Sequence, residues 1–432
     1  MALSILVIIF LGLLASGIPI FIAIGVASLM AIFFAGDIPS IIAVTRLFGG
    51  LDKFAVMALP FYILAANLMD VGGLSERIVA WAKSLVRGIT GGIAMATEVA
   101  CMAFGALSGS SPATVIAIGR LMVPHLMEEG YDKGFIAGLI TSSGSVASII
   151  PPSITMMLFA AATGASTGAL FIGGVFPGLI YGLATSIYCY WYAKKNKIGA
   201  SISKPNKDIS EGFVLATRKA SWALGVPIII IGGIYAGIVT PTEAAGLSAI
   251  YAYLVGAFIY KKIGLKELFK ICERSIVTIS QVMILIAVAS IFAWLLTVMQ
   301  LPQKMASFVS ASTSKVIFLL SINVILLIAG MFMDPNSLTI ILGPIFYLAG
   351  TALGLSPTHI GIILTVNLSI GMFTPPFGLN LFVAGAVTGE TMANIYRSVI
   401  PFIVISIVAL LIITFIPEIT LFLPNLVFKG RI

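Results

Sequence analysis

The sequence predicts an all-α polytopic membrane protein, and its composition and its pattern of apolar runs carry that prediction. Of the 432 residues, 59% are hydrophobic and only 9% are charged, against about 25% charged residues in an ordinary soluble domain. Long apolar runs with few charges are typical of helices that cross a bilayer, each of which needs roughly 20 residues. The runs are continuous and do not alternate as barrel strands do, which argues against strands.

The first half of the chain predicts three scaffold spans, a helical hairpin, a broken helix and a further span. The hairpin is Gly-rich, and the broken helix is interrupted by a proline pair, so both consist of shorter helical pieces. In chain order, the predicted elements of residues 1–193 are the spans 2–17, 19–36 and 54–75, which form a scaffold over 2–75, the hairpin 92–123, the broken helix 134–164 and the span 168–193.

The second half repeats this order after a polar stretch. The stretch over 194–220 is rich in lysine and arginine and contains no apolar run, so it predicts a solvated linker. The predicted elements of residues 221–432 are the spans 222–240, 242–260 and 276–299, which form a scaffold over 222–299, the hairpin 316–353, the broken helix 358–389 and the last span 392–424.

The distribution of lysine and arginine predicts the orientation. We assume that each half has five crossings and one re-entrant hairpin, which enters and leaves on the same side. With the linker in the cytoplasm, 18 of the 24 basic residues then lie on the cytoplasmic side and both termini lie outside. This asymmetry agrees with the positive-inside rule, although hairpins that cross fully would give the same orientation. It explains the net charge of +8 without a nucleic-acid partner.

An internal repeat relates the two halves. The matching positions, offset by 223 to 225 residues, are Ser111-Pro112 with Asp334-Pro335, Pro151-Pro152 with Pro375-Pro376, and Thr163-Gly164 with Thr388-Gly389. Because an odd number of crossings separates the copies, the second copy is expected to be inverted relative to the first. Inverted repeats with broken helices are typical of secondary transporters, whose binding sites lie near the midplane of the membrane.

The prolines supply a physical reason for a binding site. Proline inside a helix removes a donor and displaces the carbonyl four residues earlier. Freed carbonyls are tolerated in a membrane only where protein or an aqueous cavity satisfies them. A sodium ion suits such oxygens because it needs several oxygen ligands and little formal charge. A kink that only eases packing is the alternative interpretation, and the occurrence of matched pairs disfavours it.

Several motifs together resemble one transporter family. They are Phe104-Gly-Ala-Leu-Ser-Gly-Ser-Ser-Pro-Ala-Thr, Ile149-Ile-Pro-Pro-Ser, Gly330-Met-Phe-Met-Asp, His359-Ile-Gly, Thr374-Pro-Pro-Phe-Gly-Leu-Asn-Leu-Phe and Thr240-Pro-Thr-Glu. The family is the large membrane subunit of tripartite ATP-independent periplasmic (TRAP) transporters, and the resemblance covers essentially the whole chain. Each motif alone is weakly specific, and the set is highly specific.

The resemblance implies an elevator-type carrier in the bacterial inner membrane, with periplasmic termini in the orientation above. Its implied partners are a small four-helix membrane subunit and a soluble periplasmic substrate-binding protein. Sodium is the implied coupling ion, and no other cofactor is expected. The implied substrates are carboxylates such as sialic acid or a four-carbon dicarboxylate.

Symmetry of the repeat then assigns candidate site residues. The first sodium site is expected at Ser108, Ser110, Gly144, Ser145, Val146 and Pro151, and the second at Asp334, Asn336, Gly371, Thr374 and Pro375. The substrate is expected near Ser110, Ser153 and Asp334. Asp334 is the one acidic residue that we place at mid-membrane depth, where carboxylates are costly and usually functional. For Ser145, a hydroxyl that bonds back to its own helix is an equally good interpretation.

Two other functions fit parts of the sequence. A sodium–carboxylate symporter that needs no partner would have the same inverted repeat. An intramembrane hydrolase would use Ser108 as a nucleophile, but we place no histidine inside a span to activate it. His125 and His359 fall near segment ends, which favours solvated or capping roles. Glu243 is expected to complete a capping box with Thr240, so it is assigned no transport role.

Overall fold

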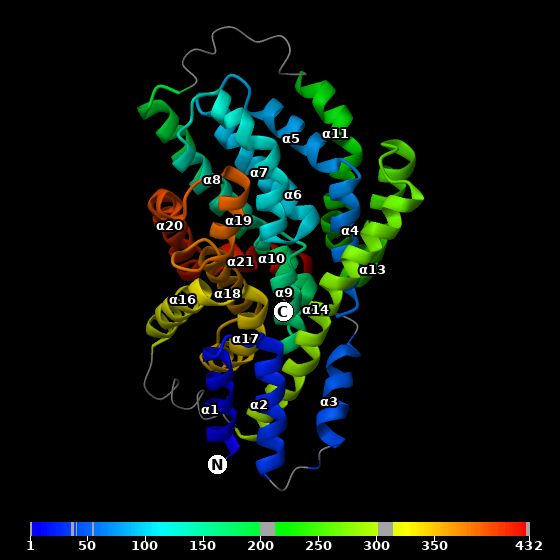
Figure 1. Ribbon diagram of the computed structural model, residues 1–432, viewed down its shortest axis with the longest axis vertical. Coiled ribbons are helices and arrows are strands. Elements are labelled where there is room, and N and C mark those ends of the chain that lie inside the picture. The colour runs from blue at the N-terminus through cyan, green and yellow to red at the C-terminus, as the bar shows by residue number, and fades with distance from the viewer. Residues whose placement is uncertain are drawn as a thin grey trace.

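The computed structural model describes residues 2–35, 39, 41–53, 56–198, 212–300 and 314–428, and the regular elements in these ranges are helices (Figure 1). Six of the described helices are long and apolar enough to cross a bilayer. Together these observations confirm the predicted all-α polytopic membrane class. Residues 199–211 of the predicted linker lie outside the described residues.

The outer surface of the helices is apolar. Phe33 is 73% exposed, Val214 is 80% exposed and Phe258 is 65% exposed. Monomeric soluble proteins rarely expose large apolar patches of this kind. The surface therefore suits lipid rather than water.

One group of helices, here called the scaffold group, is built around the long helix α14 (Leu265–Val298). Helix α14 packs against α2, α3 and α4, while α13 packs against α4 and α1 against α2. The other members of the group are α1 (Ala2–Ala15), α2 (Ile20–Ala35), α3 (Ile41–Leu51), α4 (Ala58–Val71), α11 (Phe213–Pro227) and α13 (Pro241–Leu254). Helix α5 (Leu74–Leu85) joins α11 to the centre of the molecule.

The scaffold group differs from the sequence-based expectation at four places. Helix α3 lies in a stretch where no span is predicted, and α5 follows α4 at a bend of 73°. Gly73 stands at that bend with φ 77°, in the left-handed region that glycine enters without strain. Helix α11 begins at Phe213, inside the predicted linker, and α14 begins at Leu265 rather than near residue 276.

The helices of the central group follow the predicted order of hairpin and broken helix in each half. In the first half they are α6 (Gly92–Ser108), α7 (Ser111–Glu128), α8 (Lys133–Ser145) with a 3₁₀ turn (Val146–Ser148), and α9 (Ile154–Thr163). In the second half they are α16 (Lys315–Phe332), α17 (Pro335–Ala352), α18 (Pro357–Gly371) and α19 (Leu379–Thr388). The two hairpins lie on opposite sides of the centre along the long axis (Figure 1).

The last helix of each half closes the central group. Helix α10 (Thr167–Lys195) packs against α6, α18 and α20 (Met392–Phe415). The predicted span 392–424 is not one helix, because α20 ends at Phe415 and a separate helix α21 (Glu418–Phe428) follows Pro417. Proline cannot continue the preceding helix, which accounts for the break.

The two halves exchange packing partners. Each hairpin packs against the first piece of its own broken helix, α7 against α8 and α17 against α18. Its second helix also packs against the second piece of the other broken helix, α7 against α19 and α17 against α9. The central group is therefore one interlocked body to which both halves contribute.

The repeated Thr-Gly pairs end the second pieces of the broken helices. Gly164 has φ 81° and its N–H donates to Ala160 O at 2.8 Å, while Gly389 has φ 68° and donates to Gly385 O at 2.9 Å. Such left-handed caps satisfy a free carbonyl at a helix end. The third repeated motif in the sequence is thus a matched pair of helix stops.

Candidate functional site at the two hairpin tips

The first hairpin tip touches the first proline pair. Gly109 turns the chain between α6 and α7 with φ 57°, and a Cβ atom there would collide with Pro152 O. One turn earlier, a Cβ atom on Gly105 would lie 2.6 Å from the Cα atom of Ala147. The tip and the break are therefore in direct contact, and only glycine permits both approaches.

The second hairpin makes the matching contact. A Cβ atom on Gly371, at the end of α18, would lie 2.7 Å from the Cα atom of Gly330 on α16. Gly330 and Gly371 follow Gly105 and Ala147 by 225 and 224 residues, which is the offset of the repeat. The rings of Phe332 and Phe377 lie 5.8 Å apart across the same tip and break.

The breaks leave carbonyl oxygens without their helical donors. Pro151 and Pro152 have no N–H to donate to the carbonyls of Ala147 and Ser148. The second proline pair, Pro375-Pro376, likewise cannot donate to the carbonyls at the end of α18. The hydroxyl of Ser153 donates to Ser148 O at 2.5 Å. In the second half, Met372 O accepts instead from the backbone N–H of Asn380, at 2.9 Å.

The residues of the expected first site lie at the tip and the break, and most of their polar groups already have partners. The hydroxyls of Ser108 and Thr114 lie 3.1 Å apart. Ser145 donates to Ser142 O at 2.6 Å, and its oxygen lies 2.9 Å from the hydroxyl of Tyr181. A bond back to its own helix was the alternative interpretation of Ser145, and the structure contains that bond.

The other residues of this set form the walls. Gly144 packs so closely on Val115 of α7 that a Cβ atom would collide with the valine side chain. Val146 and Pro151 are buried, whereas Ser110 at the tip is half-buried. Ser153 caps α9, since its oxygen also accepts from the N–H of Met156.

In the expected second site, Asp334 has a structural role that accounts for its position. It is the N-cap of α17, and its carboxylate accepts from the backbone N–H of Ser337 at 3.0 Å and from the hydroxyl of Ser337. Thr374 donates back to Ile370 O at 2.7 Å. Asn336 is half-buried beside the cap.

Asn380 connects the second break to the first tip, and the sequence analysis did not identify it. Its backbone belongs to the second break, while its side-chain nitrogen donates to the hydroxyl of Ser111 at the first tip, at 2.6 Å. The same nitrogen lies 3.4 Å from Thr141 O. Asn380 is fully buried, and its side-chain oxygen has no hydrogen-bond partner among the described residues.

The polar groups at the tips and breaks are mainly neutral oxygens. They are hydroxyls, amide oxygens and carbonyls, and Asp334 adds one carboxylate. The orphaned oxygen of Asn380 is the kind of buried acceptor that requires a partner. No group of three or more His, Cys, Asp or Glu side chains in the described part of the chain could hold a metal ion.

Two further polar residues differ from the sequence-based picture. His359 is buried rather than solvated, and its ring nitrogens contact the hydroxyl of Thr420 at 2.8 Å and Thr414 O at 3.2 Å, which ties α18 to α20 and α21. Glu98 on α6 is fully buried, and neither of its carboxylate oxygens has a hydrogen-bond partner in the described ranges. Glu98 lies within the range of the predicted hairpin, 92–123, and the sequence does not indicate its depth.

The predicted capping box is confirmed. The hydroxyl of Thr240 accepts from the N–H of Glu243 at 3.3 Å, and the Glu243 carboxylate accepts from the N–H of Thr240 at 2.8 Å. Glu243 thereby satisfies the start of α13.

Comparison with known proteins identifies the family. The model of the family described as "Tripartite ATP-independent periplasmic transporter, DctM component" matches residues 7–419. The chain belongs to this family. The permease is 43% identical over 381 residues, 88% of each chain, to the C4-dicarboxylate TRAP transporter large permease protein DctM of Pseudomonas aeruginosa. The predicted family membership is therefore confirmed, as is the prediction that the chain is a transporter component and not an enzyme.

A second relative is longer than this permease. The isethionate TRAP transporter permease protein DctMQ of Oleidesulfovibrio alaskensis is 40% identical over 410 residues, which cover 95% of this chain and 64% of that protein. Among solved structures, the YdaH transporter of Alcanivorax borkumensis matches with a TM-score of 0.62 at 14% identity, over 87% of this chain and 88% of that chain. The structural likeness shows the fold alone.

Proposed function

We propose that this permease imports four-carbon dicarboxylates with sodium, as the large membrane subunit of a TRAP system in a bacterial inner membrane. A periplasmic protein delivers the substrate, and a small four-helix subunit supports the scaffold group. The termini face the periplasm and the linker faces the cytoplasm, in keeping with the distribution of basic residues.

The observation that carries this proposal is the pair of contacts between hairpin tips and helix breaks. Gly105 against Ala147 and Gly330 against Gly371 join each hairpin tip to its helix break, at positions related by the repeat. Each place offers several neutral oxygens in a buried setting, which suits sodium. In this proposal the hairpins are re-entrant, the repeat is inverted, and the central group moves as an elevator against the scaffold group.

The residues assigned to the sites keep the roles expected from symmetry. The first tip with Ser110 and the second tip with Asp334 face the substrate, and Ser153, just past the first proline pair, reaches it between the two tips. Asn380 joins them, because it links the second break to the first tip. The choice of a dicarboxylate rests on the likeness to the Pseudomonas aeruginosa permease.

Uptake into liposomes tests this function. The permease, its small subunit and its binding protein are combined, and labelled succinate is supplied with an inward sodium gradient. We expect accumulation that requires sodium and is not inhibited by excess N-acetylneuraminate. Uptake unchanged after replacement of sodium by potassium contradicts the coupling.

The same assay decides between this function and a self-sufficient symporter. We expect the permease alone to give no uptake, because the scaffold group lacks its partner and the substrate lacks its carrier. Full activity of the lone permease would favour the symporter.

A further inference from the structure

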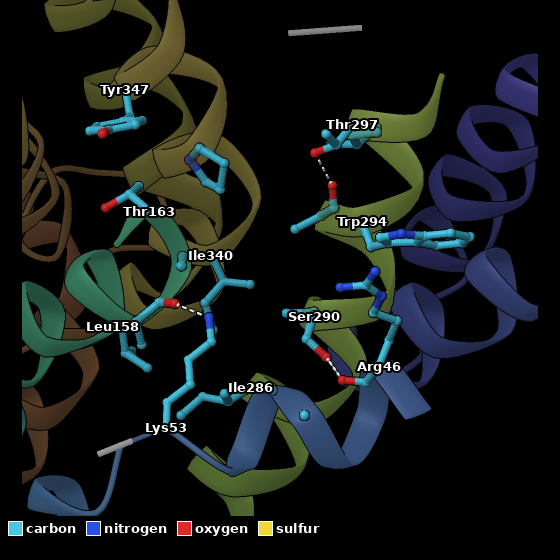
Figure 2. A pocket seen from close by; sticks show the side chains of 18 of the residues that line it. Arg46, Lys53, Leu158, Thr163, Ile286, Ser290, Trp294, Thr297, Ile340 and Tyr347 are labelled. Atoms are coloured by element: carbon cyan, nitrogen blue, oxygen red, sulfur yellow. Dashed lines mark hydrogen bonds between the residues drawn. The ribbon is translucent and has the colours of Figure 1, made fainter. Parts of the chain in front are cut away.

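A cavity lies between the scaffold group and the central group, away from the hairpin tips. Its volume is about 950 Å³. Helices α3 and α14 form one wall, and α9 and α17 form the other (Figure 2). Most lining residues are apolar or small, with a few hydroxyls such as Thr45, Ser290 and Thr297.

The charged residues that line this cavity are two cations. They are Arg46, on α3, and Lys53, which follows that helix. No aspartate or glutamate lines the cavity, and neither cation forms an ion pair within the described part of the chain. Within the described part of the chain, the cavity lining therefore has two positive charges and no negative one.

Arg46 is held by the scaffold group, and Lys53 by the central group. The guanidinium of Arg46 lies 5.4 Å from the centre of the Trp294 ring, and the hydroxyl of Ser290 donates to Arg46 O at 2.5 Å, which ties α3 to α14. Lys53 reaches across to the central group and donates to Ala161 O, in the last turn of α9, at 2.7 Å (Figure 2). An ammonium group has three donors, so Lys53 can bind another acceptor as well.

Charge and shape favour a small organic anion. Clefts with charge of one sign and apolar walls concentrate ions of the opposite sign. The guanidinium fork of Arg46 matches the two oxygens of a carboxylate. Burial lowers the pKa of the Lys53 ammonium, because leaving water disfavours its charged form, and an anion beside it opposes that effect.

We propose that this cavity is a second anion site, in which Arg46 and Lys53 hold a carboxylate before it reaches the hairpin tips. The identification of the occupant as a dicarboxylate rests on the proposed function. In the proposed orientation the cavity belongs to the periplasmic half, since both cations are among the six basic residues assigned to the outside. A carboxylate that draws Lys53 from Ala161 also breaks the hydrogen bond between Lys53 and α9.

A fluorescence titration tests the site without transport. The chain has four tryptophans, so Trp81→Phe, Trp191→Phe and Trp222→Phe leave Trp294 as the one reporter. The full chain is placed in phosphatidylcholine nanodiscs and titrated with succinate. We expect a saturable change in Trp294 fluorescence, because Arg46 moves relative to the ring when it binds the carboxylate.

Matched variants separate the site from general charge effects. Arg46→Gln and Lys53→Gln should each raise the half-saturating succinate concentration by about tenfold or more, the effect of one charged hydrogen bond. Lys315→Gln, which removes an exposed cation outside the cavity, should leave it unchanged. No response to succinate, or an equal response to uncharged succinamide, overturns the proposal.

Two further arms identify the source of the anion. If phosphatidylglycerol nanodiscs abolish the succinate response, a lipid phosphate occupies the cavity and the proposal fails. If succinate changes the fluorescence of Trp294 but is not taken up by liposomes, the anion site is supported and the proposed function is wrong. If uptake occurs and the fluorescence of Trp294 does not change, the proposed function is supported and the second anion site is wrong.

Discussion

Asp334 caps α17 through the same carboxylate that adds a negative charge at the second hairpin tip. Asp334→Asn separates these roles, because Asn is as good an N-cap as Asp but has no charge. We expect the variant to remain monodisperse, with the melting temperature little changed, while sodium-driven uptake falls by about tenfold or more. Size-exclusion chromatography, thermal melting and liposome uptake measure the three quantities.

Asp334→Ala is the control, since it removes both the cap and the charge. It should lower stability by about 0.5–2 kcal/mol in addition to abolishing uptake. Wild-type uptake by Asp334→Asn at unchanged sodium dependence would assign the residue to capping alone.

Some residue roles could be predicted from the sequence and others could not. The Asp-Pro-x-Ser sequence at Asp334 contains a start signal for a helix, although the role predicted for this residue was that of an ion or substrate ligand. Asn380 gave no such signal, because its partner Ser111 lies 269 residues away and only the fold brings them together. The depth of Glu98 likewise depends on packing between distant helices.

At the scale of helices, Gly330 and Gly371 form one of the close contacts between a hairpin and a broken helix. Gly371→Ala places a Cβ atom 2.7 Å from the Cα of Gly330, so one backbone must move. We expect a loss of about 1–3 kcal/mol in stability, together with weaker sodium activation of uptake. Thermal unfolding and the half-activating sodium concentration measure the two effects.

Gly246→Ala on α13 is the matched control, because a Cβ atom there has no neighbour within 4 Å. It should leave sodium activation unchanged and slightly increase stability, since Ala favours a helix over Gly. Equal sodium activation in Gly371→Ala and Gly246→Ala would show that the second tip is not part of the ion site.

Element order was easier to predict from the sequence than element boundaries. Proline pairs and long apolar runs marked the breaks and spans, because both act locally along the chain. Helix α3 was missed because, at 11 residues, it is too short to stand out as a span. The bend between α4 and α5 was also missed. Pro417 was a visible stop signal that the continuous apolar run obscured.

At the scale of the whole molecule, two tip-and-break sites predict cooperative use of sodium. If both sites must fill before the central group moves, uptake rises more steeply than hyperbolically with sodium. We expect a Hill coefficient above one and below the number of sites. Initial rates over a range of sodium concentrations at constant ionic strength, with choline as the replacement cation, provide the measurement. A Hill coefficient of one would contradict the cooperative use of two sodium sites.

The exchanged packing of the two halves also sets an order of events during synthesis. Helix α7 leaves the ribosome long before α19, the partner that covers one of its faces, since their starts at Ser111 and Leu379 are 268 residues apart. At about 5–20 residues per second, this delay lasts roughly 10–50 seconds. During that interval the face of α7 that packs against α19 has no partner. The first half therefore completes its structure only after most of the second half has been made.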